Sequence, residues 1–161
     1  MELRSYDPAG DDEALWRLKR AFERELGAGG TDGTAAAYEA KLADGYRTRY
    51  LGWVDRCVEE APDCVTVASA GGDLVGYAFL LPASLAMIWD AAVLNEIYVD
   101  PAVRGTGVAD DLLGAALALA REQSPPLDRV VLDVAPTNDR ARAFYARHGF
   151  EPWGELVARE L

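Results

Sequence analysis

The residue types best suited to chemistry lie in NEIYVDPAVRGTGVADDLL, residues 95–113. An apolar strand pattern leads into this segment and an apolar helix pattern leaves it. Arg104, Gly105 and Gly107 stand between the two. Glycines let a backbone approach a ligand at positive φ, and a helix N-terminus attracts negative charge. The pattern therefore predicts a phosphate-binding loop with Arg104 as an added charge, and its alternative is an ordinary glycine turn.

Two common phosphate-binding motifs fit this loop poorly. A dinucleotide site would need a third small residue where Asp110 stands. It would also need an acidic residue at the end of the next strand, whereas Asp128 lies at the start of that strand and Asp133 comes too late. A P-loop is excluded because no Lys-Ser or Lys-Thr pair follows the glycines.

The elements that position the loop follow from hydrophobic periodicity. Helical composition with breaks at Gly45 and Gly52 precedes a meander, in which Gly71-Gly72-Asp73 makes a hairpin turn. After the loop, a β-branched run is typical of a strand buried on both faces, and strand, helix, strand indicates a parallel crossover. The predicted strands cover residues 2–6, 64–69, 74–81, 91–99, 129–135 and 151–161, and the predicted helices 11–26, 34–60, 109–123 and 138–150.

The glycine loop and a second segment together resemble the GNAT superfamily of N-acetyltransferases. Arg104, Gly107 and Ala109 match in register the family's acetyl-coenzyme A signature, which is Arg or Gln, two residues, Gly, one residue, then Gly or Ala. The family's second motif is Asn, two residues, Ala, three residues, Tyr, then Gly-Phe after a short gap. It is matched by Asn138, Ala141, Tyr145, Gly149 and Phe150.

The order of elements also resembles the GNAT fold, so the likeness covers residues 1–161 as a single N-acetyltransferase domain. It implies an α/β (α+β mixed) fold with a mostly antiparallel mixed sheet of about six to seven strands and about four helices. In that fold the strands expected at 91–99 and 129–135 splay apart, and the thioester enters the gap between them.

The resemblance implies acetyl-CoA as the co-substrate. Backbone amides from Arg104 to Ala109 would bind the pyrophosphate, and the strand end at Ile97–Val99 would pair with the pantetheine arm. The cofactor-binding residues expected on this basis are Ile97, Tyr98, Val99, Arg104, Gly105, Thr106, Gly107, Val108, Ala109, Asn138, Ala141 and Tyr145.

Acetylation of an amine needs a base, because an alkyl amine with a pKa near 10.4 is mostly protonated at neutral pH. Glu96 is the candidate, since family members often carry an acidic residue at this point of the sheet. Strand alternation predicts that it shares a face with Leu94 and Tyr98. The alternative is that Glu96 only orients the substrate or pairs with an arginine.

Tyr145 matches the family's acid, which protonates the departing thiolate. Asn138, Ala141 and Tyr145 share one helical face, where the small Ala141 leaves room for the pantetheine. Tyr145 could instead be a core residue, and Asn138 is also a candidate helix cap. His148, beside Gly149, is expected to be a cap-region or surface residue rather than a catalytic one.

The amino-acid composition disfavours several classes of binding partner. Sixteen Lys and Arg against 27 Asp and Glu give a net charge of −11, which disfavours nucleic acid and anionic membranes. Two cysteines, Cys57 and Cys64, without an export signal or a long apolar run, favour reduced thiols in a cytoplasmic, soluble protein. With one histidine besides, no structural metal site is expected.

The acidic balance favours a small cationic amine as acceptor, such as a polyamine, an aminoglycoside-like amine or an amino acid derivative. The open alternatives are a protein lysine or N-terminus, longer acyl donors, and a non-catalytic acyl-CoA-binding module. Few residues follow Phe150, so a second subunit could complete the acceptor wall, and a homodimer is expected. Carboxylates expected near the acceptor, each alternatively a solvated surface group, are Asp32, Asp44, Asp55, Glu59, Glu60 and Asp90.

Overall fold

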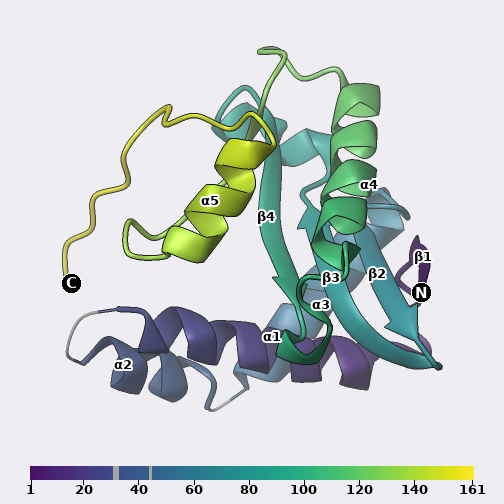
Figure 1. Ribbon diagram of the computed structural model, residues 1–161, viewed down its shortest axis with the longest axis horizontal. Coiled ribbons are helices and arrows are strands. Elements are labelled where there is room, and N and C mark those ends of the chain that lie inside the picture. The colour runs from purple at the N-terminus through teal and green to yellow at the C-terminus, as the bar shows by residue number, and fades with distance from the viewer. Residues whose placement is uncertain (31–32, 44) are drawn as a thin grey trace.

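Five strands form one sheet in the order β1-β2-β3-β4-β5. The computed structural model describes residues 1–30, 33–43 and 45–161 (Figure 1). The pairs β1–β2, β2–β3 and β3–β4 are antiparallel, and β5 is parallel to β4. The elements are β1 (Glu2–Ser5), α1 (Asp12–Ala28), α2 (Thr34–Lys41), α3 (Tyr46–Glu60), β2 (Val65–Ala70), β3 (Asp73–Leu80), η1 (Ala83–Ile88), β4 (Ala92–Val99), η2 (Pro101–Val103), α4 (Val108–Gln123), β5 (Val130–Val131) and α5 (Asp139–Arg147).

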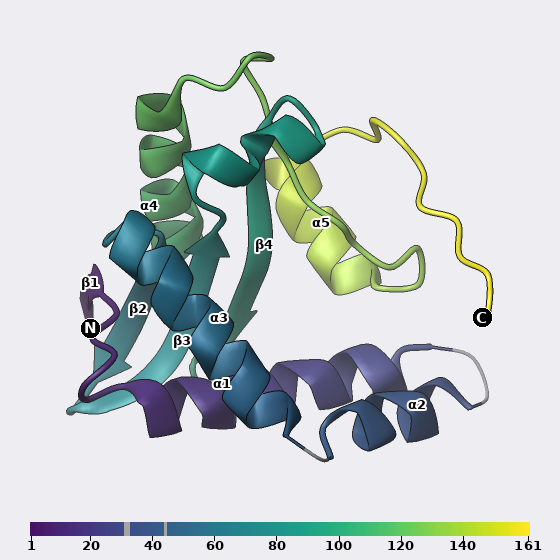
Figure 2. The ribbon, with the colours of Figure 1, turned by 180° about the vertical axis from the view of Figure 1, so that it is seen from behind.

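Helices cover both faces of the sheet, so the core has two parts (Figures 1 and 2). On one face α1 and α3 bury a cluster that includes Leu15, Val54 and Phe79. On the other face α4 buries a cluster that includes Leu80 and Leu112. The predicted fold class, a mixed and mostly antiparallel sheet flanked by helices, is confirmed.

The long helical segment predicted over residues 34–60 is two helices. Gly45 is the N-cap residue of α3 with a φ of 78°, so the predicted break occurs there. Gly52 lies within α3 and makes no break. A helix tolerates one glycine at modest cost, whereas positive φ is readily available only to glycine.

The C-terminal third departs most from the prediction. The described residues form five strands rather than six to seven, β5 has two residues, and residues 151–161 are exposed without regular structure. Val130 and Val131 are half-buried rather than buried on both faces. The strand predicted over 129–135 is therefore too long, and the strand predicted over 151–161 is wrong, since those residues form none. A strand needs a paired neighbour, and β5 is paired with β4 alone in the described sheet.

β4 and β5 separate soon after they meet. They pair only at Ala92 with Val130 and at Val93 with Val131, whereas β4 continues to Val99. The predicted splay between these strands is thus present. Beyond Val93, the edge of β4 that faces β5 has no strand partner among the described residues.

A bulge in β4 reverses the predicted facing of one side chain. Against β3, Phe79 pairs with Glu96 and Leu80 pairs with Leu94, so Asn95 is an extra residue in the ladder. Leu94 therefore packs in the cluster under α4, while Tyr98 packs in the cluster under α1 and α3. Glu96 shares a face with Tyr98 but not with Leu94, which corrects the simple alternation.

Within residues 1–30, 33–43 and 45–161, none of the helices has the length and apolar character that a membrane crossing requires.

Candidate functional site

The glycine loop carries the chain from β4 into α4. Its turn begins at Asp100, whose side chain accepts a hydrogen bond from the Ala102 amide at 3.0 Å. Gly105 and Gly107 have φ values of 80° and 93°, and Gly107 is the N-cap residue of α4. Helix geometry leaves the first amides of α4 without partners inside the helix, so they can bind an anion at the positive end of its dipole. This backbone is what the predicted phosphate site requires.

The remaining loop residues support that backbone. The Thr106 hydroxyl donates a hydrogen bond to the Val103 carbonyl at 2.6 Å, which closes the turn ahead of α4. Val108 is buried, so the first turn of α4 is anchored in the core, and Ala109 beside it is half-buried. The anchoring holds the amides of residues 105–109 in one orientation.

Arg104 lies against α1, and its charge is paired within the chain. Nε donates to the Val99 carbonyl at 2.9 Å, and Nη2 donates to Glu25 Oε1 at 2.7 Å. The Tyr98 hydroxyl donates to the same Glu25 oxygen at 3.1 Å. Burial, and then the Glu25 charge, raise the pKa of Tyr98 to about 12, so the hydroxyl stays protonated. Glu25 therefore ties the loop to α1, and no sequence pattern pointed to it.

Both ends of α5 are tied to the rest of the site. At its N-terminal end, Arg140 Nη2 lies 3.3 Å from Glu25 Oε2. At its C-terminal end, Arg147 and His148 contact Asp110 in the first turn of α4 at 2.6 Å and 2.8 Å. The hydrogen bond from Arg147 is the main reason that the pKa of Asp110 is lowered. His148 is the C-cap residue of α5, at the place expected for it.

α5 presents the second motif as predicted. The Asn138 side chain caps the helix by accepting a hydrogen bond from the Ala141 amide at 3.1 Å. The Tyr145 ring packs edge-on against Phe144 and Phe150, with centroids 5.4 Å and 5.6 Å away. Burial raises the pKa of Tyr145 to about 12. Its hydroxyl has no hydrogen-bond partner among the described residues, so a protonated donor is available to a ligand.

Ile97, Tyr98 and Val99 lie where β4 has separated from β5. Their backbone pairs with β3 on one side, and the opposite edge lacks a strand partner in the part of the chain described. An extended molecule with amide groups can add to such an edge by hydrogen bonding. The predicted pantetheine-binding segment therefore has the open edge that its role needs.

Glu96 is buried in a polar network, with 6% of its surface exposed. Its Oε1 atom accepts hydrogen bonds from Lys19 Nζ at 2.6 Å and Asn95 Nδ2 at 3.3 Å. Its Oε2 atom accepts from the hydroxyls of Tyr50 at 2.8 Å and Tyr77 at 2.7 Å. Burial, and then the charge of Glu96, raise the pKa of both tyrosines well above 10, so both hydroxyls donate. The partner that pairs with Glu96 is a lysine, not the arginine of the alternative interpretation.

Lys19 and Glu23 extend this network along α1. Lys19 Nζ lies 2.6 Å from Glu23 Oε1 as well as 2.6 Å from Glu96 Oε1, and all three side chains are nearly fully buried. Burial alone would lower the pKa of Lys19, but the two carboxylates outweigh it and raise that pKa. Burial would raise the pKa of Glu23, but the hydrogen bond from Lys19 helps to lower it. Charged residues on the apolar stripe of α1, at positions 19 and 23, were the signal that sequence reasoning missed.

The carboxylates predicted near the acceptor do not join this network. Asp32 and Asp44 lie outside the described residues. Asp55 is half-buried in α3, and burial raises its pKa. Glu59, Glu60 and Asp90 are exposed. Within the described chain, none of these last four forms a hydrogen bond or ion pair with Glu96, Lys19 or Glu23.

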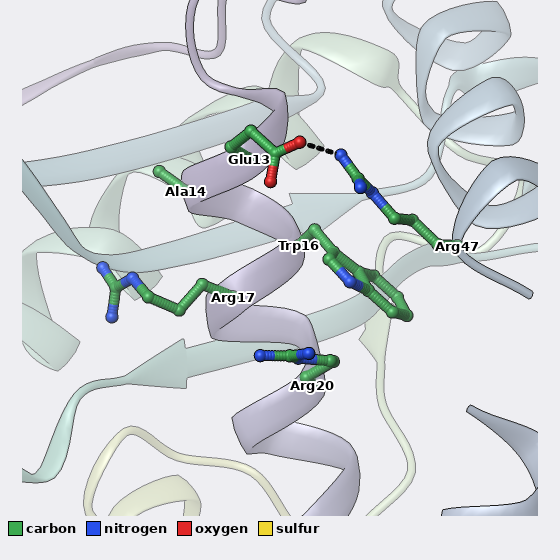
Figure 3. A pocket seen from close by; sticks show the side chains of 6 residues that line it. All are labelled: Glu13, Ala14, Trp16, Arg17, Arg20 and Arg47. Atoms are coloured by element: carbon green, nitrogen blue, oxygen red, sulfur yellow. Dashed lines mark hydrogen bonds and ion pairs between the residues drawn. The ribbon is translucent and has the colours of Figure 1, made fainter. Parts of the chain in front are cut away.

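A hollow of about 490 Å³ lies on the outer side of α1, where α3 approaches it (Figure 3). An ion pair between Glu13 and Arg47 borders it. Its other lining residues are Ala14, Trp16, Arg17 and Arg20. It includes none of the predicted site residues, so it is separate from the loop and from the Glu96 network.

Cys57 and Cys64 are both buried, unpaired thiols. Burial raises the pKa of each, to about 12 for Cys64, so both are poor nucleophiles at neutral pH. In the described ranges, no three His, Cys, Asp or Glu side chains converge as metal ligands.

A sequence model of the acetyltransferase (GNAT) family matches residues 30–150. Among curated proteins, a mycothiol acetyltransferase of Salinispora tropica is 32% identical over 99% of this chain and 47% of its own length. One of Thermobispora bispora is 31% identical over 95% of this chain and 47% of its own length. The chain thus spans about half the length of these relatives.

Among solved structures, a paiA N-acetyltransferase from Thermoplasma acidophilum in complex with coenzyme A has a TM-score of 0.72. It is 21% identical, and the match covers 93% of this chain and 89% of that one. This likeness shows a shared fold.

Proposed function

Because this chain belongs to the acetyltransferase (GNAT) family, we propose that it transfers an acetyl group from acetyl-CoA to a primary amine of a small cationic molecule. Transfer takes place by direct attack in a ternary complex. One observation carries the proposal. The N-terminus of α4, where Gly107 is the N-cap residue in the left-handed conformation, follows the open edge of β4. Together they suit a ligand that has phosphates at one end and amides along an extended arm.

Residues 105–109 bind the pyrophosphate through backbone amides, and the open edge at Ile97–Val99 pairs with the pantetheine. Ala141 leaves room for the arm beside α5. No charged side chain is needed to bind the pantetheine arm, since its amide groups form hydrogen bonds with the backbone of β4.

The chemical step joins the amine nitrogen to the acetyl carbon and breaks the bond from that carbon to sulfur. The amine loses a proton toward Glu96, and the sulfur leaves as a thiolate that is protonated to coenzyme A. Glu96 already accepts four hydrogen bonds, so we assign proton transfer to it through the Tyr50 hydroxyl, which is bonded to it and, unlike the fully buried Tyr77, keeps some exposure.

Tyr145 donates to the departing sulfur. With a pKa of about 12, its hydroxyl is protonated at neutral pH, and it stabilises a thiolate of pKa near 8.5 chiefly as a hydrogen-bond donor. Tyr145 keeps its proton, and the released thiolate takes one from water to give coenzyme A.

Thiol release from acetyl-CoA with a panel of amines and peptides tests the proposal. Release should depend on small cationic amines and fall about tenfold to hundredfold in Tyr145→Phe, the range expected for a lost hydrogen bond to a charged group. Phe144→Leu serves as the control, because it alters the packing beside the Tyr145 ring and keeps the Tyr145 hydroxyl. It should lower release less than Tyr145→Phe does.

Release with peptides alone would move the acceptor class to proteins. Tight coenzyme A binding without release would indicate a binding module, and no binding would contradict the assignment of the loop.

A further inference from the structure

The ammonium group of Lys41 lies in surroundings that suit an alkylammonium ligand. Its Nζ atom is 2.5 Å from Glu23 Oε2. It also lies over two aromatic rings, with centroid distances of 4.8 Å for Tyr38 and 5.3 Å for Tyr46. A carboxylate combined with aromatic faces is the set of groups that proteins use to hold ammonium ions.

The carboxylate is the buried partner of this pair and the lysine is the accessible one. The Glu23 side chain is 3% exposed, whereas that of Lys41 is 40% exposed. Apart from this ion pair, Glu23 Oε2 receives no hydrogen bond of good geometry from the described residues. When Lys41 moves away, this buried oxygen is left without a donor among the described residues, so it favours any ammonium that approaches it from the open side.

Lys41 can leave this position without disturbing the core. It is the last residue of α2, a helix of eight residues of which none is buried. The glycines that flank this helix, Gly33 and Gly45, both have positive φ, at 88° and 78°. A helix with no core contribution has little to lose when one side chain moves.

The position is linked to the proposed chemistry. The other oxygen of Glu23 contacts Lys19, and Lys19 contacts Glu96 on β4. An ammonium on Glu23 Oε2 is therefore separated from the assigned base by this carboxylate and one lysine. That places it beside the network that handles the amine.

We propose that Glu23, Tyr38 and Tyr46 form an ammonium-binding site, which Lys41 fills in the free protein and which a second, non-reacting ammonium of a diamine acceptor takes during turnover. The inference rests on the proposed function. One nitrogen of a diamine must be neutral to attack the thioester, whereas the other keeps its charge because its pKa lies near 10.4. The site binds that second, charged nitrogen, so the acceptor class is an aliphatic diamine rather than a monoamine.

Calorimetric titration with 1,4-diaminobutane and 1,6-diaminohexane tests the site without turnover. Lys41→Met should tighten binding of the better diamine on the order of tenfold, because the competing internal ammonium is gone. Adding Glu23→Gln should abolish this gain, and adding Tyr38→Leu should reduce it about threefold. Tyr38→Leu remains informative if the loss of the Glu23 charge prevents folding. Arg121→Met, which removes an exposed charge from α4, should leave binding unchanged.

No gain in Lys41→Met, or an equal gain in Arg121→Met, would overturn the site. Equal binding of 1-butanol, which has no ammonium, would overturn it as well.

Turnover separates the site from the proposed function. Wild type should acetylate the diamine with kcat/KM about tenfold above 1-aminobutane, and Tyr38→Leu should lower the diamine value while leaving that for 1-aminobutane unchanged. An equal loss for both amines would show a structural role and overturn the site. Diamine binding in the variants without acetylation of any amine would uphold the site and contradict the proposed function.

Discussion

At the scale of the residue, Lys19 holds together the most highly charged part of the interior. It is a single ammonium between the carboxylates of Glu23 and Glu96, and each of the three side chains is at most 5% exposed. Charges removed from water must find close partners, and removal of one partner leaves another charge uncompensated. Lys19 is thus a positioning residue, which fixes the carboxylates on which the proposed proton transfer and the ammonium site depend.

We predict that Lys19→Met lowers the free energy of unfolding by about 3–5 kcal/mol near neutral pH. The pH dependence should reverse as well. In the wild type the lowered pKa of Glu23 contributes stability above the unfolded value, and this is lost as the pH falls through the folded pKa. In Lys19→Met the burial that raises the pKa of Glu23 is no longer opposed by Lys19, so protonation of Glu23 is favoured and stability should rise between about pH 7 and pH 5. Urea unfolding at both pH values measures the free energy of unfolding of each protein.

Arg121→Met provides the matched loss of one positive charge at an exposed position. This substitution should change the free energy of unfolding by less than about 0.5 kcal/mol. It should leave the pH dependence of that free energy unchanged. A Lys19→Met protein with wild-type stability and slope would show that the carboxylates do not depend on Lys19.

At the scale of the element, the N-terminus of α4 depends on Gly107. Its φ of 93° is unfavourable for any residue with a Cβ, although an added Cβ would meet no atom within 4 Å. We predict that Gly107→Ala costs about 1–2 kcal/mol, because the strain is conformational rather than steric. Coenzyme A binding should weaken by about tenfold in a calorimetric titration, since the strained loop no longer presents its amides together.

Gly114→Ala in the same helix is the matched control. This glycine lies within α4, is exposed, and also has no atom within 4 Å of an added Cβ. The change should stabilise the protein by about 0.5–1 kcal/mol and leave binding unaltered. Weakening by both substitutions alike would point to the helix as a whole rather than to the φ of Gly107.

Elements with strong periodicity or clear glycine chemistry could be predicted from the sequence. The meander, α4, the loop at Gly105 and Gly107, and the Asn138 cap are of this kind, because local residues determine them. The β4 bulge and the two-residue β5 could not be predicted, because each depends on which strand lies alongside and where pairing ends. The apolar composition of residues 129–135 predicts a strand buried on both faces, but it carries no information on whether a further strand lies beyond it, and Val130 and Val131 are only half-buried.

The candidate site was predictable to the same degree. The motifs locate Arg104, Gly107, Asn138 and Tyr145, because their spacing is local. The contacts of α1 with the site are long-range, such as Glu25 with Arg104 and Lys19 with Glu96, which join residues 79 and 77 positions apart. No single-sequence pattern carries such pairings.

At the scale of the whole molecule, the sheet ends at β5. The chain beyond Phe150 extends away from the helices and the sheet (Figures 1 and 2). Leu156 and Val157 are 63% and 90% exposed. The ring contact in this segment is that of Arg129 with Trp153, at 5.3 Å. A segment with so few contacts contributes little to the stability of a fold.

We predict that a chain ending at Glu151 folds and loses less than about 1 kcal/mol of unfolding free energy, the size of one exposed cation–π contact. Thermal unfolding of the two chains, with sedimentation to record their association, makes the comparison. A large loss of stability or a change of association state would show that residues 152–161 pair in solution, either with β5 or with a second copy, as the predicted last strand and homodimer require.

The extra residue at Asn95 determines on which face of the sheet the later side chains of β4 lie. Side chains on a strand alternate, so one inserted residue moves every following side chain to the opposite face. Ile97 and Val99 thereby pack toward α4, and Glu96 and Tyr98 point toward α1 and α3. Deletion of Asn95 would leave these four side chains chemically unchanged, yet it would exchange the two sets. An alignment that closes this position without a gap would therefore equate residues that lie on opposite faces of the sheet.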